Sequence, residues 1–453
     1  MKKIPFYILI LVTALLAVTT AFERPLGTQI SHEAVYDAPW FWALWGLLAG
    51  GVIYRLKDVR KFGISTLIGH IGMVVILAAA LVTALTSQRG RLHLRIGESA
   101  DMFLVSHNHV EHLPFEVTLD DFDVEFYGDS ITPKNYVSYL STDSVEVISK
   151  MNQPAKIGRY RFLQTGCDDD GFGSTLQVNY DPWGTPLTYV GYALLAIALL
   201  LRAFSWKGVL ALAAALGLMC VPEVGGGSEM PFEIPEWTGL AICGAGLILL
   251  AIFKKRYIHY ILLVPFVAMY VLRWYYGGHM PLGNSYDTLQ FLTIGLLAAP
   301  GGIASVALAT CAQLVACMSV FSSQMSPLAP VLASPLLCLH VTVVMFAYVL
   351  LAYLLVKPSR KVLKKAVALL ATGIVIGAVW ANVSWGNYWH WDPKEVWALI
   401  TMFIYCLPLH AASLPVFKKK KVFNLYCRLA FIAVLFTYFG VNLVLGGFHS
   451  YFK

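Results

Sequence analysis

The feature that most constrains this chain is a long succession of apolar runs, many of them about as long as a membrane crossing. Hydrophobic residues make up 58% of the 453 residues and charged residues only 13%. A helix needs roughly 20 apolar residues to cross a bilayer. The sequence therefore predicts an all-α polytopic membrane protein, surrounded by lipid and with no nucleic acid among its partners, rather than a soluble enzyme.

The runs predict about thirteen membrane helices. They cover, approximately, residues 4–21, 40–54, 63–86, 186–203, 207–221, 237–253, 257–275, 287–299, 302–321, 335–356, 366–382, 396–416 and 426–447. The run at 287–299 is short for a complete crossing. We interpret the first run as a retained helix rather than a cleaved signal peptide, because it is long and lacks a small-x-small cleavage site.

A polar segment of about a hundred residues, 87–184, interrupts the apolar runs. Three stretches in it alternate apolar and polar residues between turn-forming residues, namely 115–127, 136–140 and 174–180. This pattern is typical of half-buried strands, so we expect a small β-rich domain outside the membrane. Three histidines in it either bind a metal or, as the simpler interpretation, are solvated loop residues: His107, His109 and His112.

The basic residues between the runs define an orientation. Twenty lysines and arginines fall in six alternate junctions: Lys2 and Lys3; Arg55, Lys57, Arg60 and Lys61; Arg202 and Lys207; Lys254, Lys255 and Arg256; Lys357, Arg360, Lys361, Lys364 and Lys365; and Lys418 to Lys421. The short loops of the other side and the C-terminal tail hold three: Arg24, Lys394 and Lys453. Because cytoplasmic loops carry the excess of basic residues, the N-terminus is predicted inside, and the β-rich domain and the C-terminus outside.

The segment 385–397, Trp-Gly-Asn-Tyr-Trp-His-Trp-Asp-Pro-Lys-Glu-Val-Trp, is the most unusual part of the chain. Asp392, Pro393 and Glu395 supply an N-cap, a proline at the first helical position and an acid at the third, so a helix should begin here. An interfacial aromatic belt accounts for two or three aromatic residues. Four indoles in one outer loop instead predict an apolar platform for a planar ligand: Trp385, Trp389, Trp391 and Trp397.

Four histidines fall at two depths in this topology. His340 and His449 lie near the outer ends of their helices, whereas His70 and His410 lie about two turns from the inner ends. An ionisable residue inside a membrane is costly and is a functional candidate, although a hydrogen-bonded helix contact is the alternative for any single one. Neutral imidazole is a common axial ligand of haem iron. The pairs therefore predict two bis-histidine sites for haem b.

Several motifs resemble cytochrome c maturation proteins. The Trp-rich segment is similar to the WWD signature of haem-handling proteins, in the form found in the ResC/CcsA branch. Residues 278–289, Gly-His-Met-Pro-Leu-Gly-Asn-Ser-Tyr-Asp-Thr-Leu, resemble a further segment of that family. The surroundings of His340, His410 and His449 resemble those of its haem-binding histidines. Asp392 belongs to the WWD motif and is expected near the ligand.

The first part of the chain resembles ResB, the partner of ResC. His70-Ile71-Gly72 is similar to the helix that supplies the inner histidine, and 114–122 and 156–164 resemble the outer domain of ResB. The whole looks like a fused ResB–ResC protein of the CcsBA type. We therefore expect four parts: ResB-like helices at 1–86, the β-rich domain at 87–184, a ResB-like helix and a linking helix at 185–236, and a ResC/CcsA-like haem-handling helical domain with the WWD loop at 237–453.

The resemblance implies a holocytochrome c synthase of the haem lyase type in the cytoplasmic membrane of a bacterium. It would export haem and attach it to the CxxCH thiols of an apocytochrome c, which thiol-reducing proteins keep reduced. This chain has no C-x-x-C-H of its own. No residue is assigned as a catalytic acid, base or nucleophile, and Lys394, Asn387 and Arg273 are candidates for the haem propionates.

Three other classes compete with this interpretation. A haem exporter or chaperone that delivers haem to a separate ligating partner shares the same motifs. A proton-coupled transporter would carry Asp or Glu within its helices, and the apolar runs have essentially none. A respiratory cytochrome b would need histidine pairs without the indole platform.

Overall fold

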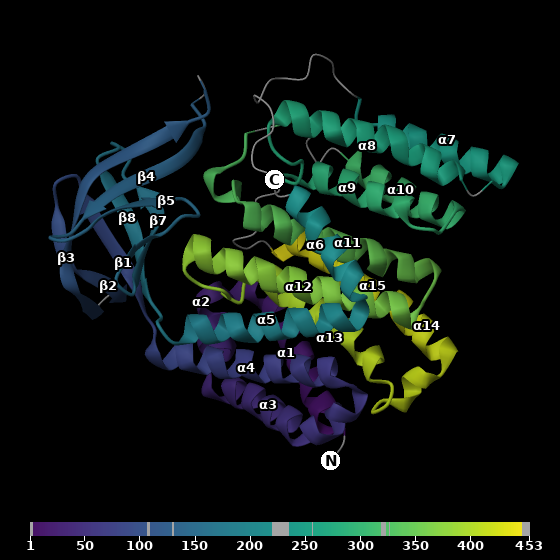
Figure 1. Cartoon of the computed structure of the whole chain (residues 1–453), viewed down its shortest axis with the longest axis horizontal. Coiled ribbons are helices and arrows are strands. Elements are labelled where there is room, and N and C mark those ends of the chain that lie inside the picture. The colour runs from purple at the N-terminus through teal and green to yellow at the C-terminus, as the bar shows by residue number, and fades with distance from the viewer. Residues whose placement is uncertain are drawn as a thin grey trace.

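The computed structural model describes residues 3–106, 109–128, 131–219, 235–255, 257–318, 323–325 and 327–445. These residues form a mostly helical body with one antiparallel sheet at one end of it (Figure 1). The predicted division into membrane helices and a β-rich domain is therefore confirmed in outline.

The N-terminal helices pack as a group with α5, which returns from the sheet. The elements are α1 (Ile4–Leu26), α2 (Thr28–Ser31), a π-helical turn η1 (His32–Tyr36), α3 (Pro39–Val59), a 3-10 turn η2 (Arg60–Phe62), α4 (Ile64–Thr86), α5 (Gly184–Ala203) and α6 (Trp206–Met219). Two glycines let α4 and α5 lie close together. A Cβ atom at Gly72 would come 2.8 Å from the backbone nitrogen of Leu195, and one at Gly191 would come 3.0 Å from that of Ile76. Small residues at such contacts are a general device of membrane helix packing.

Replacing Gly72 by alanine should therefore push α4 away from α5. Because the added carbon meets backbone rather than a flexible side chain, we expect a destabilisation of about 1–3 kcal/mol, measured as thermal unfolding of the protein in detergent. Gly50→Ala is the matched control, since nothing lies within 4 Å of a Cβ at that helical glycine. Equal stability of the two variants would show that the α4–α5 contact is not tight.

The sheet has eight strands in the order β5-β4-β3-β2-β1-β8-β7-β6, all antiparallel. The strands are β1 (Gln88–Arg95), β2 (Ser99–Ser106), β3 (His109–Phe126), β4 (Pro133–Ser141), β5 (Glu146–Lys150), β6 (Ala155–Ile157), β7 (Tyr160–Cys167) and β8 (Gly173–Tyr180). Its core contains Phe103, Val117, Leu119, Phe162 and Val178. The three predicted stretches correspond to β3, β4 and β8, and five further strands went unpredicted.

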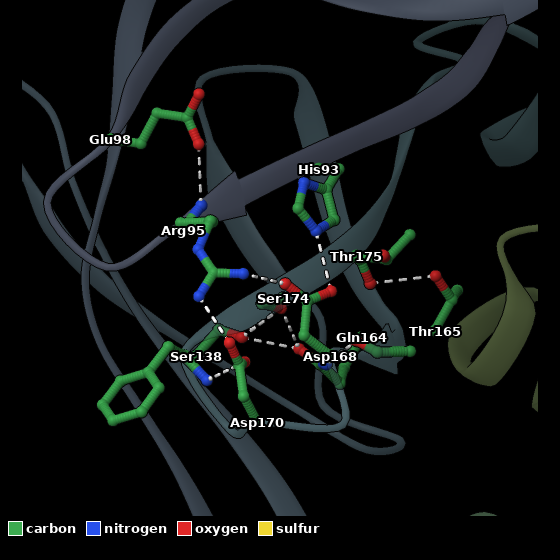
Figure 2. A network of polar contacts seen from close by, with 12 residues as sticks. His93, Arg95, Glu98, Ser138, Gln164, Thr165, Asp168, Asp170, Ser174 and Thr175 are labelled. Carbon is green, nitrogen blue, oxygen red and sulfur yellow. Dashed lines mark hydrogen bonds and ion pairs between the residues drawn. The ribbon is translucent and has the colours of Figure 1, made fainter.

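A network of polar contacts joins β1 to the turn between β7 and β8 (Figure 2). Arg95 donates to Asp168 at 2.9 Å and to Asp170 at 2.6 Å, and His93 Nε2 lies 2.9 Å from Asp168. The hydrogen bond from Arg95 lowers the pKa of the Asp170 carboxyl. Because these charges are exposed, their ion pairs contribute little to the free energy of unfolding and mainly fix the conformation of the β7–β8 turn.

His109 and His112 lie on strand β3 and not in a loop, which corrects the simpler interpretation of these residues. His109 Nε2 is 2.9 Å from Glu111, and His112 Nδ1 is 3.5 Å from Asp101. His107 lies outside the described residues. Within the described part of the chain, no group of three or more His, Cys, Asp or Glu side chains could hold a metal ion.

The C-terminal helices form a second group, with α12 between α5 and α11 (Figure 1). They are α7 (Thr238–Phe253), α8 (Ile258–Gly277), α9 (Ser285–Ala298), α10 (Ile303–Ala316), a 3-10 turn η3 (Pro330–Leu332), α11 (Pro335–Val356), α12 (Arg360–Trp385), α13 (Pro393–Cys406), the 3-10 turns η4 (Leu407–His410) and η5 (Pro415–Lys418), α14 (Lys420–Leu429), α15 (Phe431–Leu435) and the π-helical η6 (Phe436–Leu445). Leu351, Leu354, Leu363 and Leu370 are fully buried where α11 and α12 meet.

The structure does not confirm the predicted number of about thirteen membrane helices. Seven helical segments of the described residues are long and apolar enough to cross a bilayer: α1, α4, α5, α8, α11, α12 and the continuous segment Lys420–Leu445. α9 and α10 have 14 residues each, about 21 Å at 1.5 Å per residue, which is less than the ~30 Å of a hydrocarbon core. The run 396–416 is divided because Pro408 follows the end of α13.

Segments predicted on the same side of the membrane lie at the same end of the protein. At one end, Arg202 donates to the carbonyl of Phe62 at 3.0 Å, and Arg360 donates to that of Pro408 at 3.1 Å. At the other end, Asn152 of the sheet donates to the carbonyl of Pro330 at 3.1 Å. The basic junctions are thus grouped away from the sheet.

Candidate functional site

The Trp-rich segment forms a short loop between two helices. α12 ends at Trp385 and is capped by Gly386, whose φ of 75° is in the left-handed region that favours glycine. α13 begins at Pro393, and the side chain of Asp392 accepts a hydrogen bond of 2.9 Å from the backbone of Lys394. The predicted helix start is confirmed.

The sheet and the adjoining ends of α4 and α5 contact this loop. Asn179 of β8 donates to the carbonyl of Gly386, at a point where a Cβ atom would lie only 3.0 Å from the Asn179 amide. Tyr388 donates to Asp181 at 2.9 Å, and its hydroxyl lies 2.5 Å from that of Thr83. The loop is therefore hydrogen-bonded both to the β-rich domain and to α4.

Trp391 and Trp389 face the N-terminal helices. Trp391 has a φ of 58°, which is rare for a bulky residue. Its ring stacks on Tyr36 with centroids 4.9 Å apart and planes 3° apart. Trp389 stands almost perpendicular to Trp391, at 5.9 Å and 87°. Such local strain persists where the surrounding structure fixes it, and it is concentrated at functional sites.

The other two predicted indoles pack elsewhere. Trp385 lies against Trp380, with centroids 4.7 Å apart and planes 64° apart. Trp397 lies 4.1 Å from the ring of Phe436 and donates to Thr20 at 3.0 Å. The four indoles therefore do not lie in one plane, and the structure brings only Trp389 and Trp391 into a common cavity.

The inner histidines, predicted from separate helices, lie side by side. The rings of His70 and His410 have centroids 6.0 Å apart and are nearly perpendicular, at 82°. His70 Nδ1 lies 2.8 Å from the carbonyl oxygen of Thr66, and His410 Nδ1 lies 2.9 Å from that of Cys406. Because a ring that donates from Nδ1 keeps the lone pair on Nε2, each imidazole is in the form that binds metal.

This separation suits two imidazoles on one metal ion. Metal–imidazole bonds of about 2 Å on opposite sides of an ion place the two ring centroids roughly 6 Å apart. Haem iron accepts such a pair of axial ligands.

A single large cavity joins the inner histidines to the Trp-rich loop. Its volume is about 1380 Å³, above the ~300–1,000 Å³ common for small-molecule pockets. It follows α4 from Ser65 to Ser87, a length of roughly 33 Å at 1.5 Å per residue. Its walls come from α3, α4 and α5 on one side and from α12, α13 and the loop on the other. Most of its lining is apolar, which suits a flat hydrophobic ligand.

His340 lies on the far side of α12 from this cavity. Its Nδ1 is 2.7 Å from the carbonyl oxygen of Gly373, and a Cβ atom at Gly377 would come 2.5 Å from the same nitrogen. The cavity is lined by Ala371 and Ala378, which occupy the opposite face of α12 at 3.6 residues per turn. His449 lies outside the described residues, so the outer pair stays a prediction.

Two of the three candidates for the propionates are engaged elsewhere. Arg273 forms a buried ion pair with Asp287 at 2.7 Å, and Lys394 donates to Asn442 at 3.0 Å. Asn387 lines the cavity next to His390.

Most residues of the cavity were not predicted from the sequence, and these include the ionisable residues Glu23, Arg89 and His390. Glu23 was placed after the end of the first apolar run, whereas α1 continues to Leu26 and buries it. His390 had no assigned role, although its position inside the Trp-rich segment was a usable signal. No sequence signal marked Arg89.

Two known protein families match separate parts of this chain. The family described as "Cytochrome C assembly protein" matches residues 353–449, and the ResB-like family matches residues 59–180. The chain is 33% identical over 229 residues to the cytochrome c biogenesis protein CcsA of Chlamydomonas reinhardtii, covering 41% of this chain and 64% of that protein. It is 30% identical over 238 residues to CcsA of Guillardia theta, covering 40% of this chain and 79% of that protein.

A third relative is much longer than the region it shares with this chain. The protein NrfI of Wolinella succinogenes is 33% identical over 217 residues, which is 40% of this chain and 24% of NrfI. The chain thus spans about two thirds of the first of these relatives and a quarter of this one.

Proposed function

This chain belongs to the CcsA family of cytochrome c biogenesis proteins and carries a ResB-like segment ahead of its CcsA-like part. From this premise we propose that it exports haem across the cytoplasmic membrane and attaches it covalently to the CxxCH thiols of an apocytochrome c. The observation that carries the proposal is the cavity that runs the length of α4. Two histidines whose Nε2 lone pairs are available to a metal lie toward one end of it, and the Trp-rich loop lies at the other.

Haem enters, in this proposal, from the end where the basic junctions gather. Arg202 and Lys364 line the cavity there, close to the level of His70. Cations at this mouth attract the two negatively charged propionates of the substrate. His70 and His410 then ligate the iron through Nε2. The grouping of the basic junctions supports a cytoplasmic location for this end and an outer location for the sheet, the Trp-rich loop and the C-terminus.

Transit follows the shared wall of the two family segments. α4 lies within the ResB-like match, and α12 and α13 lie within the CcsA-like match. The cavity between them is about as long as the ~30 Å hydrocarbon core, so one cavity offers a continuous apolar path. This accounts for the occurrence of both segments in a single chain.

At the outer side His340 and His449 are proposed to hold the iron, with Asp392 maintaining the start of α13 and the four indoles, Trp385, Trp389, Trp391 and Trp397, around the loop. The histidine of CxxCH then replaces one axial ligand. Each thiol adds across a vinyl group of the porphyrin: a C–S bond forms, the C=C bond becomes single, and the thiol hydrogen goes to the other vinyl carbon. No net oxidation occurs, so the thiols need only arrive reduced. The contribution of the protein is positioning.

Co-expression with a reporter apocytochrome c tests this function. In a host without its own cytochrome c maturation genes, we expect haem that stays on the reporter after denaturing electrophoresis. A reporter whose two CxxCH cysteines are serine is the control and should carry none. Haem found outside the cytoplasm without covalent product would instead favour an exporter or chaperone, and absence of both would reject haem export as well.

A further inference from the structure

One arginine, Arg89, lines the outer end of the cavity, and a second, Arg161, lies near it on the same face of the sheet. Arg89, Asn179 and Arg161 are direct partners across the neighbouring strands β1, β8 and β7, so their side chains lie on one face of the sheet. Asn179 binds the carbonyl of Gly386, which places this row against the start of the Trp-rich loop. At a strand spacing of about 4.8 Å, the two arginines stand roughly 10 Å apart at the backbone.

Among the residues that the structure describes, neither arginine forms an ion pair with a carboxylate. Arg89 lines the cavity, its Nε is buried without a hydrogen-bond partner, and it makes no ion pair with any side chain that the structure describes. Arg161 donates through one amino group to Asn382 at 2.9 Å, while its other amino group is buried without a partner. Burial lowers the pKa of both guanidinium groups, and for Arg89 the charge of Arg161 lowers it further.

Asp181, the carboxylate whose charge acts on both arginines, is occupied by other donors. Asp181 accepts hydrogen bonds from the hydroxyls of Thr83, Thr185 and Tyr388 at 2.9–3.0 Å and from the backbone of Gly184 at 2.9 Å. The negative charge of Asp181 therefore stabilises the two guanidinium groups through space, without forming an ion pair with either. A buried cation without a hydrogen-bonded partner is expensive, and such an arrangement is typical of a site for an anionic ligand.

Trp389 adds a neutral donor to the same end of the cavity. Its indole Nε1 is buried and has no hydrogen-bond partner among the described residues, and the residue lines the cavity beside Tyr388. An indole can only donate, so an acceptor is missing here too. Carboxylate oxygens satisfy both the indole and the guanidinium, and Arg binds carboxylate in a bidentate manner.

We propose that Arg89, backed by Arg161 and the indole N–H of Trp389, binds the carboxylates of the porphyrin when it reaches the outer end of the cavity. The identity of the ligand rests on the proposed function, whereas the demand for an anion rests on the geometry alone. The β-rich domain then has a direct part in handling the substrate, because it supplies both arginines.

The position of Arg89 separates it from the inner site. Along α4, His70 and Ser87 are 17 residues apart, which is about 26 Å at 1.5 Å per residue. A porphyrin held by His70 and His410 is therefore too far away to touch Arg89. Loss of Arg89 affects haem only after it has left the inner histidines, and the inner haem serves as an internal control.

The first experiment compares Arg89→Gln with Arg91→Gln. Arg91 lies on the same strand, is exposed and does not line the cavity, so its replacement removes the same charge from the same domain. For Arg89→Gln we expect purified protein with normal haem content and an unchanged absorption spectrum, yet holocytochrome c yield reduced at least about tenfold. Arg89→Lys should recover part of it, since Lys keeps the charge but not the bidentate geometry. Equal yields from Arg89→Gln and Arg91→Gln overturn the proposal.

The second experiment changes the ligand and compares the wild type with Arg89→Gln. Purified wild-type protein is supplied with haem or with haem dimethyl ester, which has no charged carboxylates, and the covalent product on a reporter apocytochrome c is measured. We expect the ester to be transferred at least about tenfold less well, and this difference to shrink in Arg89→Gln because the two changes remove one interaction. Equal transfer by the wild type, or an unchanged difference in the variant, rejects carboxylate binding by Arg89. Failure of the wild type to transfer haem at all would reject the proposed function instead.

Discussion

His70→Ala and His410→Ala should each yield protein that is inserted and folded but purified with at least tenfold less haem. The rings lie with centroids 6.0 Å apart, and both Nδ1 atoms are bonded to carbonyl oxygens four residues earlier, which leaves both Nε2 atoms for iron. Loss of even an outer-shell partner of a metal site commonly costs 10–100-fold in affinity, and loss of a ligand costs more. Haem content per protein, from a reduced-minus-oxidised spectrum, measures the effect.

The control for this prediction is His259→Ala. His259 is a buried histidine of α8 that does not line the cavity, so its loss reports the general cost of removing an imidazole from the helices. We expect its haem content to stay normal. If His70→Ala and His410→Ala retain as much haem as the wild type, the inner pair is a helix contact and not a ligand set.

The sequence predicted correctly those helices and strands whose formation depends on residues that are close together in the chain. The Asp392-Pro393 start of α13 follows from capping chemistry within four residues, and the structure has it at the same place. The alternation of apolar and polar residues in β8 likewise predicted a strand, because every second side chain of a strand lies on the same, buried face. His70 and His410 were paired by depth alone, and depth is preserved when helices stand side by side.

Relations that depend on the pairing of distant segments could not be predicted in the same way. The residues that surround Arg89 belong to β7, β8 and the Trp-rich loop, which are about 70 to 300 residues away in the sequence. The four indoles were expected to share one platform, but the helix starting at Pro393 turns Trp397 toward α1 and η6. The number of crossings stays a prediction, because apolar composition does not distinguish a full crossing from the 14-residue helices α9 and α10.

His340→Ala and His449→Ala should abolish holocytochrome c formation while the inner haem remains. In this structure α12 separates His340 from the cavity, since the ring packs on Gly373 and Gly377 of the face opposite to Ala371. Haem bound at His70 and His410 therefore does not depend on His340, and a purified variant should keep its haem and lose only the covalent product. Both quantities are measured in the same cells, by the spectrum and by the haem stain of the reporter cytochrome.

A purely structural role of His340 makes a different prediction, and two further measurements distinguish it. His340→Asn retains a side-chain N–H for the carbonyl of Gly373 but cannot replace an imidazole as an axial ligand. If the hydrogen bond between α11 and α12 is what matters, the Asn variant should be active; if ligation matters, it should be as inactive as Ala. Free imidazole should then partly restore His340→Ala, because a small ligand can occupy the space of the missing side chain. Normal cytochrome c assembly in both His340→Ala and His449→Ala would remove the outer pair from the mechanism and leave the cavity as a path whose exit has other ligands.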